Sequence, residues 1–149
     1  KTLPGLRYAQ KHAVRCGGGV NHRMGLYDAF LIKENHIALC GSIVSAVTRA
    51  RQMVPGKTIT VEVETLCEVE QALNAQVDTI LLDNFTLDQI KQAVLLVKSC
   101  AKLEVSGNID YSTIVSVAAT GVNFISLGAL TKHVQAIDLS MRMTSCDLE

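Results

Sequence analysis

The sequence predicts an α/β fold, an incomplete and open parallel β/α barrel of the TIM-like kind, on two observations. Five short runs rich in Val, Ile, Leu and Phe alternate with segments whose apolar residues recur at helical spacing. The residues at the ends of those runs, Lys33, Glu62, Asp83, Ser106 and Gly128, lie 29, 21, 23 and 22 residues apart by their numbers. Spacings of this size match one strand–helix unit of such a barrel.

The predicted strands are short and nearly continuous in apolar residues, as expected for parallel strands covered on both faces. They span residues 29–32, 58–63, 79–82, 103–105 and 124–127. Each predicted helix follows a residue whose side chain can cap it. Ser42 precedes 43–53, Thr65 precedes 66–74, Thr86 precedes 87–98 and Asp110 precedes 111–119, and a helical lead-in covers 6–14. Alternation of this kind predicts right-handed βαβ units.

The length of the chain limits how many units it can hold. A complete barrel needs about 200 residues or more, and this chain has 149. It begins at Lys1 rather than at a methionine, so we expect residues 1–149 to be one domain cut from a longer protein. An open doubly wound sheet shares the same local pattern and is the alternative fold.

The composition predicts a cytoplasmic protein. Fourteen Lys and Arg residues balance fourteen Asp and Glu residues, so no overall basic field would attract nucleic acid or an anionic membrane. No apolar run reaches the roughly 20 residues that span a bilayer. The five cysteines are scattered, without the spacing of a metal site, and predict reduced, mostly buried thiols.

Charged residues end the first three predicted strands, where a β/α barrel carries its functional groups. Lys33 allows three interpretations, namely a Schiff-base nucleophile, an anion ligand or a solvated strand end. Glu62 and Glu64 share one strand face, and predict binding of a cation, a metal or hydroxyls unless one pairs with a structural Lys or Arg. Asp83 is predicted to face a metal or the reaction centre, because Thr86 is the better helix cap.

Small residues end the late strands. Ser106, Gly107 and Asn108 follow the fourth strand, and Gly128 and Ala129 follow the fifth. Turns of this kind let backbone N–H groups approach a phosphate, and the late strand ends are the usual phosphate site of β/α barrels. We therefore predict that these residues bind a phosphate.

A glycine-rich loop at residues 17–23, GGGVNHR, precedes the first strand. It matches neither GxGxxG nor the Walker pattern, which argues against a nucleotide fingerprint. His22 and Arg23 offer a donor and a guanidinium fork suited to carboxylates, or are simply solvated.

Six segments together resemble the quinolinate phosphoribosyltransferase family. They are KTLPGLR at 1–7, GGGVNHR at 17–23, LIKENH at 31–36, VEVE at 61–64, LDNF at 82–85 and SLGALT at 126–131. The resemblance runs from Lys1 to about Met141. It implies that quinolinate reacts with phosphoribosyl pyrophosphate and loses carbon dioxide, giving nicotinate mononucleotide and pyrophosphate for NAD synthesis, with Mg²⁺ as cofactor.

The resemblance also assigns residues to roles. It implies that His22, Arg23 and Lys33 hold the quinolinate carboxylates, and that Lys1 lies near the pyridine and the pyrophosphate. Glu62 and Asp83 would face the ribose hydroxyls and hold Mg²⁺ largely through water. The turns that contain Ser106, Gly107 and Asn108, and Gly128 and Ala129, would take the ribose 5-phosphate. Asn108 stands where a second glycine is commoner.

In the family as the resemblance describes it, an open barrel follows a separate N-terminal α/β domain, and the partner in a homodimer closes each site. Residues 1–149 would then be the C-terminal barrel domain. The alternatives are a paralogous phosphoribosyltransferase that acts on another ring acid, a molybdenum-transport-associated relative of the same fold, a Schiff-base aldolase that uses Lys33, and a non-catalytic domain that binds phosphate ligands or serves assembly.

Overall fold

The computed structural model describes residues 1–143, which form one five-stranded parallel sheet with helices. The strands are β1 (Phe30–Ile32), β2 (Ile59–Val63), β3 (Thr79–Asp83), β4 (Lys102–Ser106) and β5 (Phe124–Ile125). Their order in the sheet is their order in the sequence. A doubly wound sheet reverses its strand order at a switch point, so this unreversed order confirms the open barrel. Within residues 1–143, β1 and β5 are its two edges.

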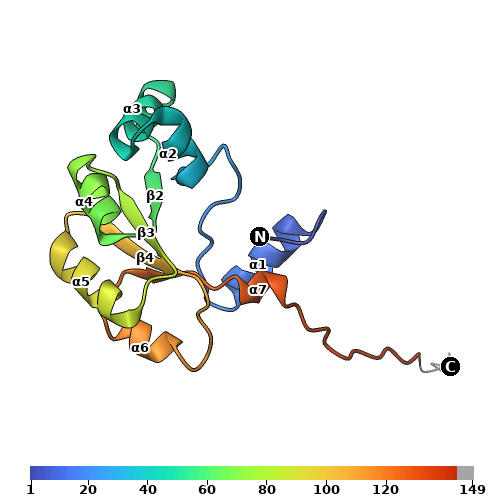
Figure 1. The fold of residues 1–149 in the computed structure, drawn as a ribbon. Helices are drawn as coiled ribbons and strands as arrows, with labels where there is room; N and C mark the ends of the chain where they lie inside the picture. Colours follow the sequence, from blue (N-terminus) through green and yellow to red (C-terminus); the bar gives the residue numbers. More distant parts are fainter. Residues whose placement is uncertain (144–149) are drawn as a thin grey trace.

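The described residues form seven helices, most of which cover the outer side of the sheet (Figure 1). They are α1 (Arg7–Cys16), α2 (Glu34–Cys40), α3 (Ile43–Met53), α4 (Leu66–Asn74), α5 (Leu87–Val97), α6 (Ile114–Ala118) and α7 (Ala129–Lys132). The predicted bounds of α3 and α4 are confirmed residue for residue, and each begins at its predicted cap. The side chains of Ser42 and Thr65 accept hydrogen bonds from the backbone N–H groups of Ser45 and Glu68. Thr86 caps α5 in the same way.

The last predicted helix is shorter in the structure, and two helices, α2 and α7, were not predicted. The helix predicted at 111–119 is only α6, because the Asp110 carboxylate accepts hydrogen bonds from the N–H groups of Ser112 and Thr113 in a turn that delays the helix. Helix α2 was not predicted, and it starts directly after Lys33 at the end of β1. The Lys33 backbone N–H donates to His36 Nδ1 at 3.0 Å, which fixes the first turn of α2.

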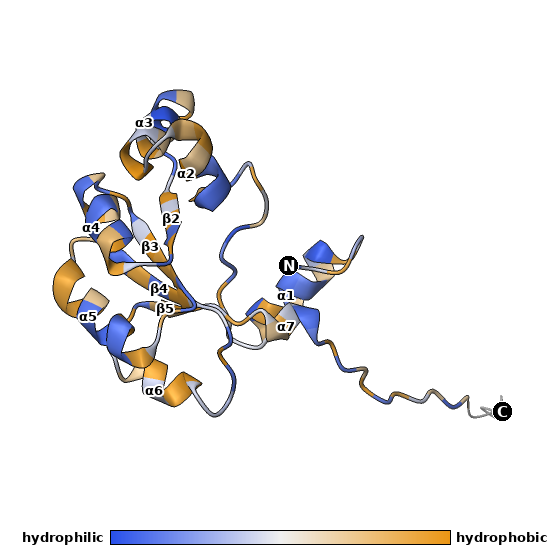
Figure 2. Ribbon diagram, in the orientation of Figure 1, coloured by the Kyte–Doolittle hydropathy of each residue, from blue (hydrophilic) through white to orange (hydrophobic). Residues whose placement is uncertain are grey.

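The core lies between the sheet and its helices. Val61, Val63, Ile80, Leu82 and Val105 are each at most 2% exposed. They pack in one cluster with helix residues that include Val47, Val69 and Ile90. Hydrophobic and hydrophilic residues alternate along these helices (Figure 2). Burial on this scale supplies the main driving force for folding.

Helices α1 and α7 lie beside one another, away from the helices that cover the sheet (Figure 1). Neither contains a buried residue. The Gln10 side chain donates to the Thr131 carbonyl at 3.1 Å, and the Thr131 hydroxyl donates to the Lys1 carbonyl. These bonds hold the beginning of the described chain beside the turn that follows β5.

The prediction that most cysteines are buried is wrong for the described residues. Cys16, Cys67 and Cys100 are exposed and Cys40 is half-buried, all as free thiols. The helical positions of Cys16 and Cys67 point away from the core. Cys146 lies outside the described residues. None of the helices described is long and apolar enough to cross a membrane.

Candidate active site

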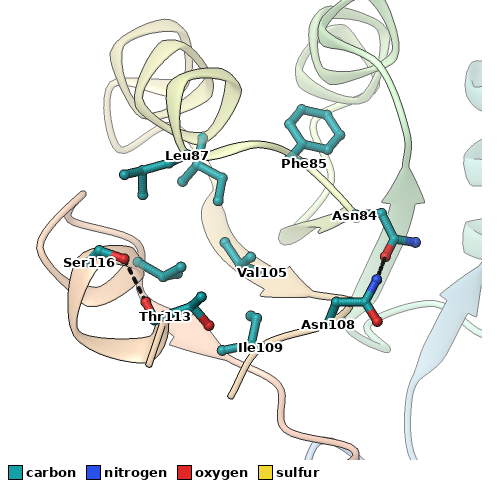
Figure 3. A pocket seen from close by; sticks show the side chains of 11 residues that line it. Asn84, Phe85, Leu87, Val105, Asn108, Ile109, Thr113 and Ser116 are labelled. Carbon is teal, nitrogen blue, oxygen red and sulfur yellow. Dashed lines mark hydrogen bonds between the residues drawn. The ribbon is translucent and has the colours of Figure 1, made fainter. Parts of the chain in front are cut away.

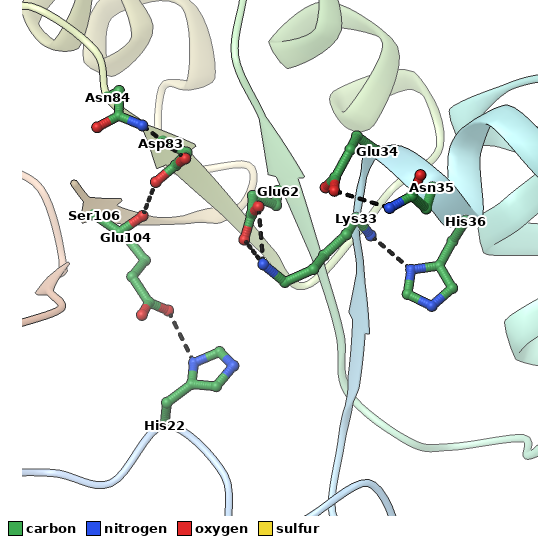
Figure 4. A network of polar contacts seen from close by, with 10 residues as sticks. All are labelled: His22, Lys33, Glu34, Asn35, His36, Glu62, Asp83, Asn84, Glu104 and Ser106. Carbon is green, nitrogen blue, oxygen red and sulfur yellow. Dashed lines mark hydrogen bonds and ion pairs between the residues drawn. The ribbon is translucent and has the colours of Figure 1, made fainter. Parts of the chain in front are cut away.

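Strand pairing brings polar residues together on the face of the sheet opposite the helix core. Glu62 pairs with Leu81, Leu81 with Glu104, and Asp83 with Ser106. Because paired residues point to the same side and alternate residues share a face, Glu62, Asp83, Glu104 and Ser106 all lie on this inner face. Figure 4 shows these residues and Lys33 near the carboxyl ends of the strands, where they form separate polar contacts.

Lys33 and Glu62 form an ion pair across β1 and β2. Lys33 Nζ lies 2.8 Å from Glu62 Oε2 and donates to Oε1 at 3.0 Å. The Glu62 side chain is 15% exposed, whereas that of Lys33 is 43% exposed. The acid is thus held inside while the lysine remains open to solvent. Glu64 is exposed just beyond the end of β2.

Asp83 is joined to the fourth strand. The Ser106 hydroxyl donates to Asp83 Oδ1 at 2.7 Å, and the Asn84 amide donates to Oδ2 at 2.9 Å. Thr86, rather than Asp83, caps α5, as predicted. The Asp83 carboxylate therefore faces the strand ends and not the helix.

The turn after β4 depends on a close approach between Gly107 and Asn84. Gly107 has φ +92°, and a Cβ atom there would lie 2.2 Å from Asn84 Oδ1. Asn108 adopts φ +48°, a left-handed conformation that Asn tolerates better than most residues. Its amide donates to Asn84 Oδ1 at 3.4 Å (Figure 3). Asn108 therefore occupies a left-handed position, a backbone conformation that glycine adopts most readily.

Behind this turn lies a cavity of about 230 Å³ between α5 and α6 (Figure 3). Ile90, Val105 and Val117 form its apolar wall, while Asn84 and Gly107 lie at its border. The small space beneath the turn is therefore lined by both apolar and polar side chains, the polar ones being Asn84, Asn108, Thr113 and Ser116.

Glu104 was not predicted as a site residue, although it lies at the centre of the inner face. It is 5% exposed. His22 Nδ1 lies 3.3 Å from its Oε2, and the Ser126 hydroxyl donates to its Oε1. Burial alone would raise the pKa of Glu104, but the hydrogen bonds from His22 and Ser126 bring that pKa below its usual value.

The loop that carries His22 and Arg23 is fastened to α1. Lys11 Nζ donates to the Arg23 carbonyl, and Arg7 Nε to the Met24 carbonyl, each at 2.5 Å. Arg23 itself donates to the Ala29 carbonyl at 3.1 Å. Burial, together with the nearby charges of Arg7 and Arg23, lowers the pKa of Lys11. A concentration of positive charge therefore borders this loop.

The other predicted phosphate turn lies at the start of α7. Gly128 precedes this helix and Ala129 begins it. The stem of Lys132, which the sequence did not single out, passes 3.4 Å from where a Cβ of Gly128 would be. Lys1 lies close by, because its carbonyl is bonded to Thr131 in the same helix. Two lysines therefore border the turn.

The structure thus brings the predicted residues together in three groups. Lys33 contacts Glu62, Asp83 contacts Ser106, and His22 contacts the inner face through Glu104. Among residues 1–143, no cluster of three or more His, Cys, Asp or Glu side chains could by itself hold a metal ion. The carboxylates of Glu62 and Asp83, on the neighbouring strands β2 and β3, nevertheless suit Mg²⁺. This ion usually takes its remaining ligands from water and substrate phosphates.

Residues 1–142 match one protein family, the quinolinate phosphoribosyl transferase C-terminal domain. This chain belongs to that family. The resemblance drawn from the six segments is thereby confirmed. The roles assigned above to single residues of this quinolinate phosphoribosyltransferase barrel stay predictions.

Named relatives agree with this membership. The chain is 46% identical over 145 residues to a probable carboxylating nicotinate-nucleotide pyrophosphorylase of Bacillus subtilis, covering 97% of this chain and 50% of that protein. It is 43% identical over 144 residues to the corresponding enzyme of Mycobacterium leprae, covering 95% and 51%. The chain therefore spans about half the length of the curated relatives it matches.

Solved structures agree as well. The nicotinate-nucleotide pyrophosphorylase of Francisella tularensis is similar with a TM-score of 0.90 at 56% identity, covering 93% of this chain and 50% of that one. A thiamine phosphate pyrophosphorylase of Pyrococcus furiosus has a TM-score of 0.60 at 18% identity over 85% of this chain and 68% of that one, which shows a shared fold alone.

Proposed function

We propose that this chain is the catalytic barrel of a carboxylating nicotinate-nucleotide pyrophosphorylase, an enzyme of NAD synthesis. One observation carries the proposal: cationic side chains, acidic side chains and two glycine turns lie together at the carboxyl ends of the parallel strands, with Lys33 paired to Glu62 and Asp83 bonded to Ser106. Family membership supports the reaction, which joins quinolinate to phosphoribosyl pyrophosphate and releases carbon dioxide.

In this proposal, the cations near the beginning of the chain bind quinolinate. His22, Arg23 and Lys33 would neutralise the two ring carboxylates, since charge-assisted hydrogen bonds from cations are the strong ones. The loop that holds Arg23 is fixed by side chains of α1, which would reduce the entropy lost when substrate binds.

The acids and the late turns would bind phosphoribosyl pyrophosphate. Glu62 and Asp83 would face the ribose hydroxyls and hold Mg²⁺ through water, and the metal would neutralise the pyrophosphate. The 5-phosphate would lie against the backbone of Gly107 and of Gly128. Lys1 would stabilise the departing pyrophosphate. Each contact acts by position and charge, without a covalent enzyme intermediate.

The bond changes follow from the substrates. The pyridine nitrogen forms a bond to the anomeric carbon of ribose, while the bond to pyrophosphate breaks and pyrophosphate leaves with the electron pair. The ring is then cationic and accepts the electron pair of the breaking carbon–carboxylate bond. Carbon dioxide leaves, and the ring carbon takes a proton from water.

We also propose that the complete enzyme is a cytoplasmic homodimer or larger homo-oligomer in which a partner subunit helps to close the site. The chain spans about half of its relatives, so the remaining half would supply further contacts. Free cysteines among the described residues support a reducing compartment. The balanced charge supports small-molecule substrates rather than nucleic acid.

The function is tested in the full-length protein by measuring carbon dioxide released from quinolinate. Arg23→Ala and Lys33→Ala should each raise the KM for quinolinate by roughly tenfold or more, because each removes one charge-assisted contact with the substrate. The KM for phosphoribosyl pyrophosphate should change much less. Equal losses for both substrates would contradict the assigned roles, and a borohydride-trapped adduct on Lys33 would instead indicate an aldolase.

A further inference from the structure

Glu104 has no place in the mechanism above, yet it is the most buried acid of the inner face. The side chain of Glu104 is 7% exposed and that of His22 is 30% exposed. One carboxylate oxygen contacts His22 Nδ1 (Figure 4). The other accepts a hydrogen bond from the Ser126 hydroxyl, so both oxygens are engaged within the protein. The free edge of the imidazole, with Nε2, remains for a ligand.

The charge of Glu104 decides which proton His22 carries. An ionised carboxylate only accepts hydrogen bonds, so His22 Nδ1 must be a donor. A neutral ring protonated at Nδ1 has a lone pair at Nε2, which would repel a carboxylate oxygen. Only a ring with protons on both nitrogens can bridge Glu104 and an anionic ligand.

The other charged groups nearby are already engaged. Lys33 is paired with Glu62, and Asp83 accepts from Ser106. Arg23, the neighbour of His22, donates to a backbone carbonyl and lies near Lys11 and Arg7. Glu104 is the carboxylate that contacts His22, and its only other side-chain partner within residues 1–143 is Ser126.

We propose that Glu104 is a positioning residue that makes His22 a donor at both ring nitrogens when an anionic ring acid binds, so that binding takes up a proton. The inference rests on the proposed function, because quinolinate is the acid concerned. A purely structural alternative is that Glu104 only fastens the loop to the sheet.

Calorimetry of quinolinate binding to the full-length protein, repeated in buffers of different ionisation enthalpy, separates these two explanations. In mildly alkaline buffer the wild-type protein should take up a proton on binding. Glu104→Gln should abolish this uptake and weaken binding of quinolinate by roughly tenfold. Binding of phosphoribosyl pyrophosphate should stay near normal. Glu70→Gln, at an exposed carboxylate on α4, should change neither property and serves as the matched control.

A double-mutant cycle provides the second comparison. If Glu104 acts through His22, Glu104→Gln should have no further effect on quinolinate affinity once His22→Ala is present. Additive losses, or unchanged proton uptake in Glu104→Gln, would overturn the inference. Should Glu104→Gln fail to fold, Ser126→Ala keeps the acid and should retain the uptake.

Nitrogen NMR of His22 in the ligand-free protein distinguishes failure of the inference from failure of the proposed function. Protonation at Nδ1 that is lost in Glu104→Gln supports the assignment for His22 whatever the ligand. No such change overturns it. If wild-type protein binds no quinolinate while the Nδ1 signature is present, the proposed function alone is rejected.

Discussion

At the scale of the residue, Gly107 is the position of the site where the structure leaves no room for a side chain. Its φ of +92° and the position of Asn84 Oδ1, 2.2 Å from where a Cβ atom would be, both exclude a larger residue. Gly56 has a similar φ of +81° but nothing within 4 Å. The two glycines therefore separate the cost of backbone conformation from the cost of crowding.

We predict that Gly107→Ala lowers the free energy of unfolding by about 2–4 kcal/mol, from left-handed strain and overpacking together. Gly56→Ala should cost about 1–2 kcal/mol from strain alone. Urea unfolding of the full-length protein measures both, and calorimetry with nicotinate mononucleotide should show weaker binding only for Gly107→Ala. Equal costs at the two positions would show that contact with Asn84 is unimportant.

Individual site residues were predictable from sequence where they end a strand. Lys33, Glu62 and Asp83 each follow an apolar run, and the structure places all three at the strand ends. Glu104 lies within a strand, and its partner His22 is 82 residues away, so no local pattern joins them. The sequence nevertheless contained one indication of Glu104: it is an acid inside the predicted fourth strand, where an apolar buried residue is expected.

At the scale of the element, caps were the most reliable local signal. Ser42 and Thr65 fixed the start of α3 and α4 to the residue, because their side chains satisfy N–H groups that a helix leaves free. The short α2 escaped prediction, because it follows β1 without a loop and its first turn is closed by His36 rather than by Ser, Thr, Asp or Asn.

Asp110 makes the stability of the turn before α6, residues 110–113, depend on pH. Hydrogen bonds from Ser112 and then Thr113 lower the pKa of Asp110. A carboxyl whose pKa is lower in the folded than in the unfolded state binds fewer protons when folded. Its stabilisation is therefore full above the unfolded pKa, and is lost as pH falls through the folded pKa.

We predict that Asp110→Ala lowers the Tm at neutral pH and that this difference from wild type shrinks below about pH 4. Thermal unfolding followed by circular dichroism from about pH 2 to about pH 7, a range that brackets the ordinary pKa of Asp, would measure this difference in Tm. Glu70→Ala, which removes an exposed acid from α4, should leave the Tm nearly unchanged at every pH. A constant difference between Asp110→Ala and wild type would contradict the hydrogen-bonding explanation.

At the scale of the whole molecule, stability is unevenly distributed. The sheet and α3–α5 share one core, in which residues such as Val61 and Leu82 are fully buried. Helices α1 and α7 bury no residue, and hydrogen bonds from Arg7 and Lys11 tie α1 to the site loop. Periodicity predicted that α1 exists, but could not show that it packs on α7 rather than on the sheet.

We predict that amide hydrogens of β2, β3 and β4 exchange with solvent only through global unfolding, whereas those of α1 and α7 exchange through local opening. The reason is that local stability follows buried apolar contact, which the two outlying helices lack. Hydrogen exchange of the full-length protein, with and without quinolinate, measures this difference. Binding should slow exchange in α1, because α1 fastens the loop that carries His22 and Arg23. Exchange in α1 as slow as in β3 without ligand would show that further contacts, from the half of the relatives that this chain does not span, already hold this helix in place.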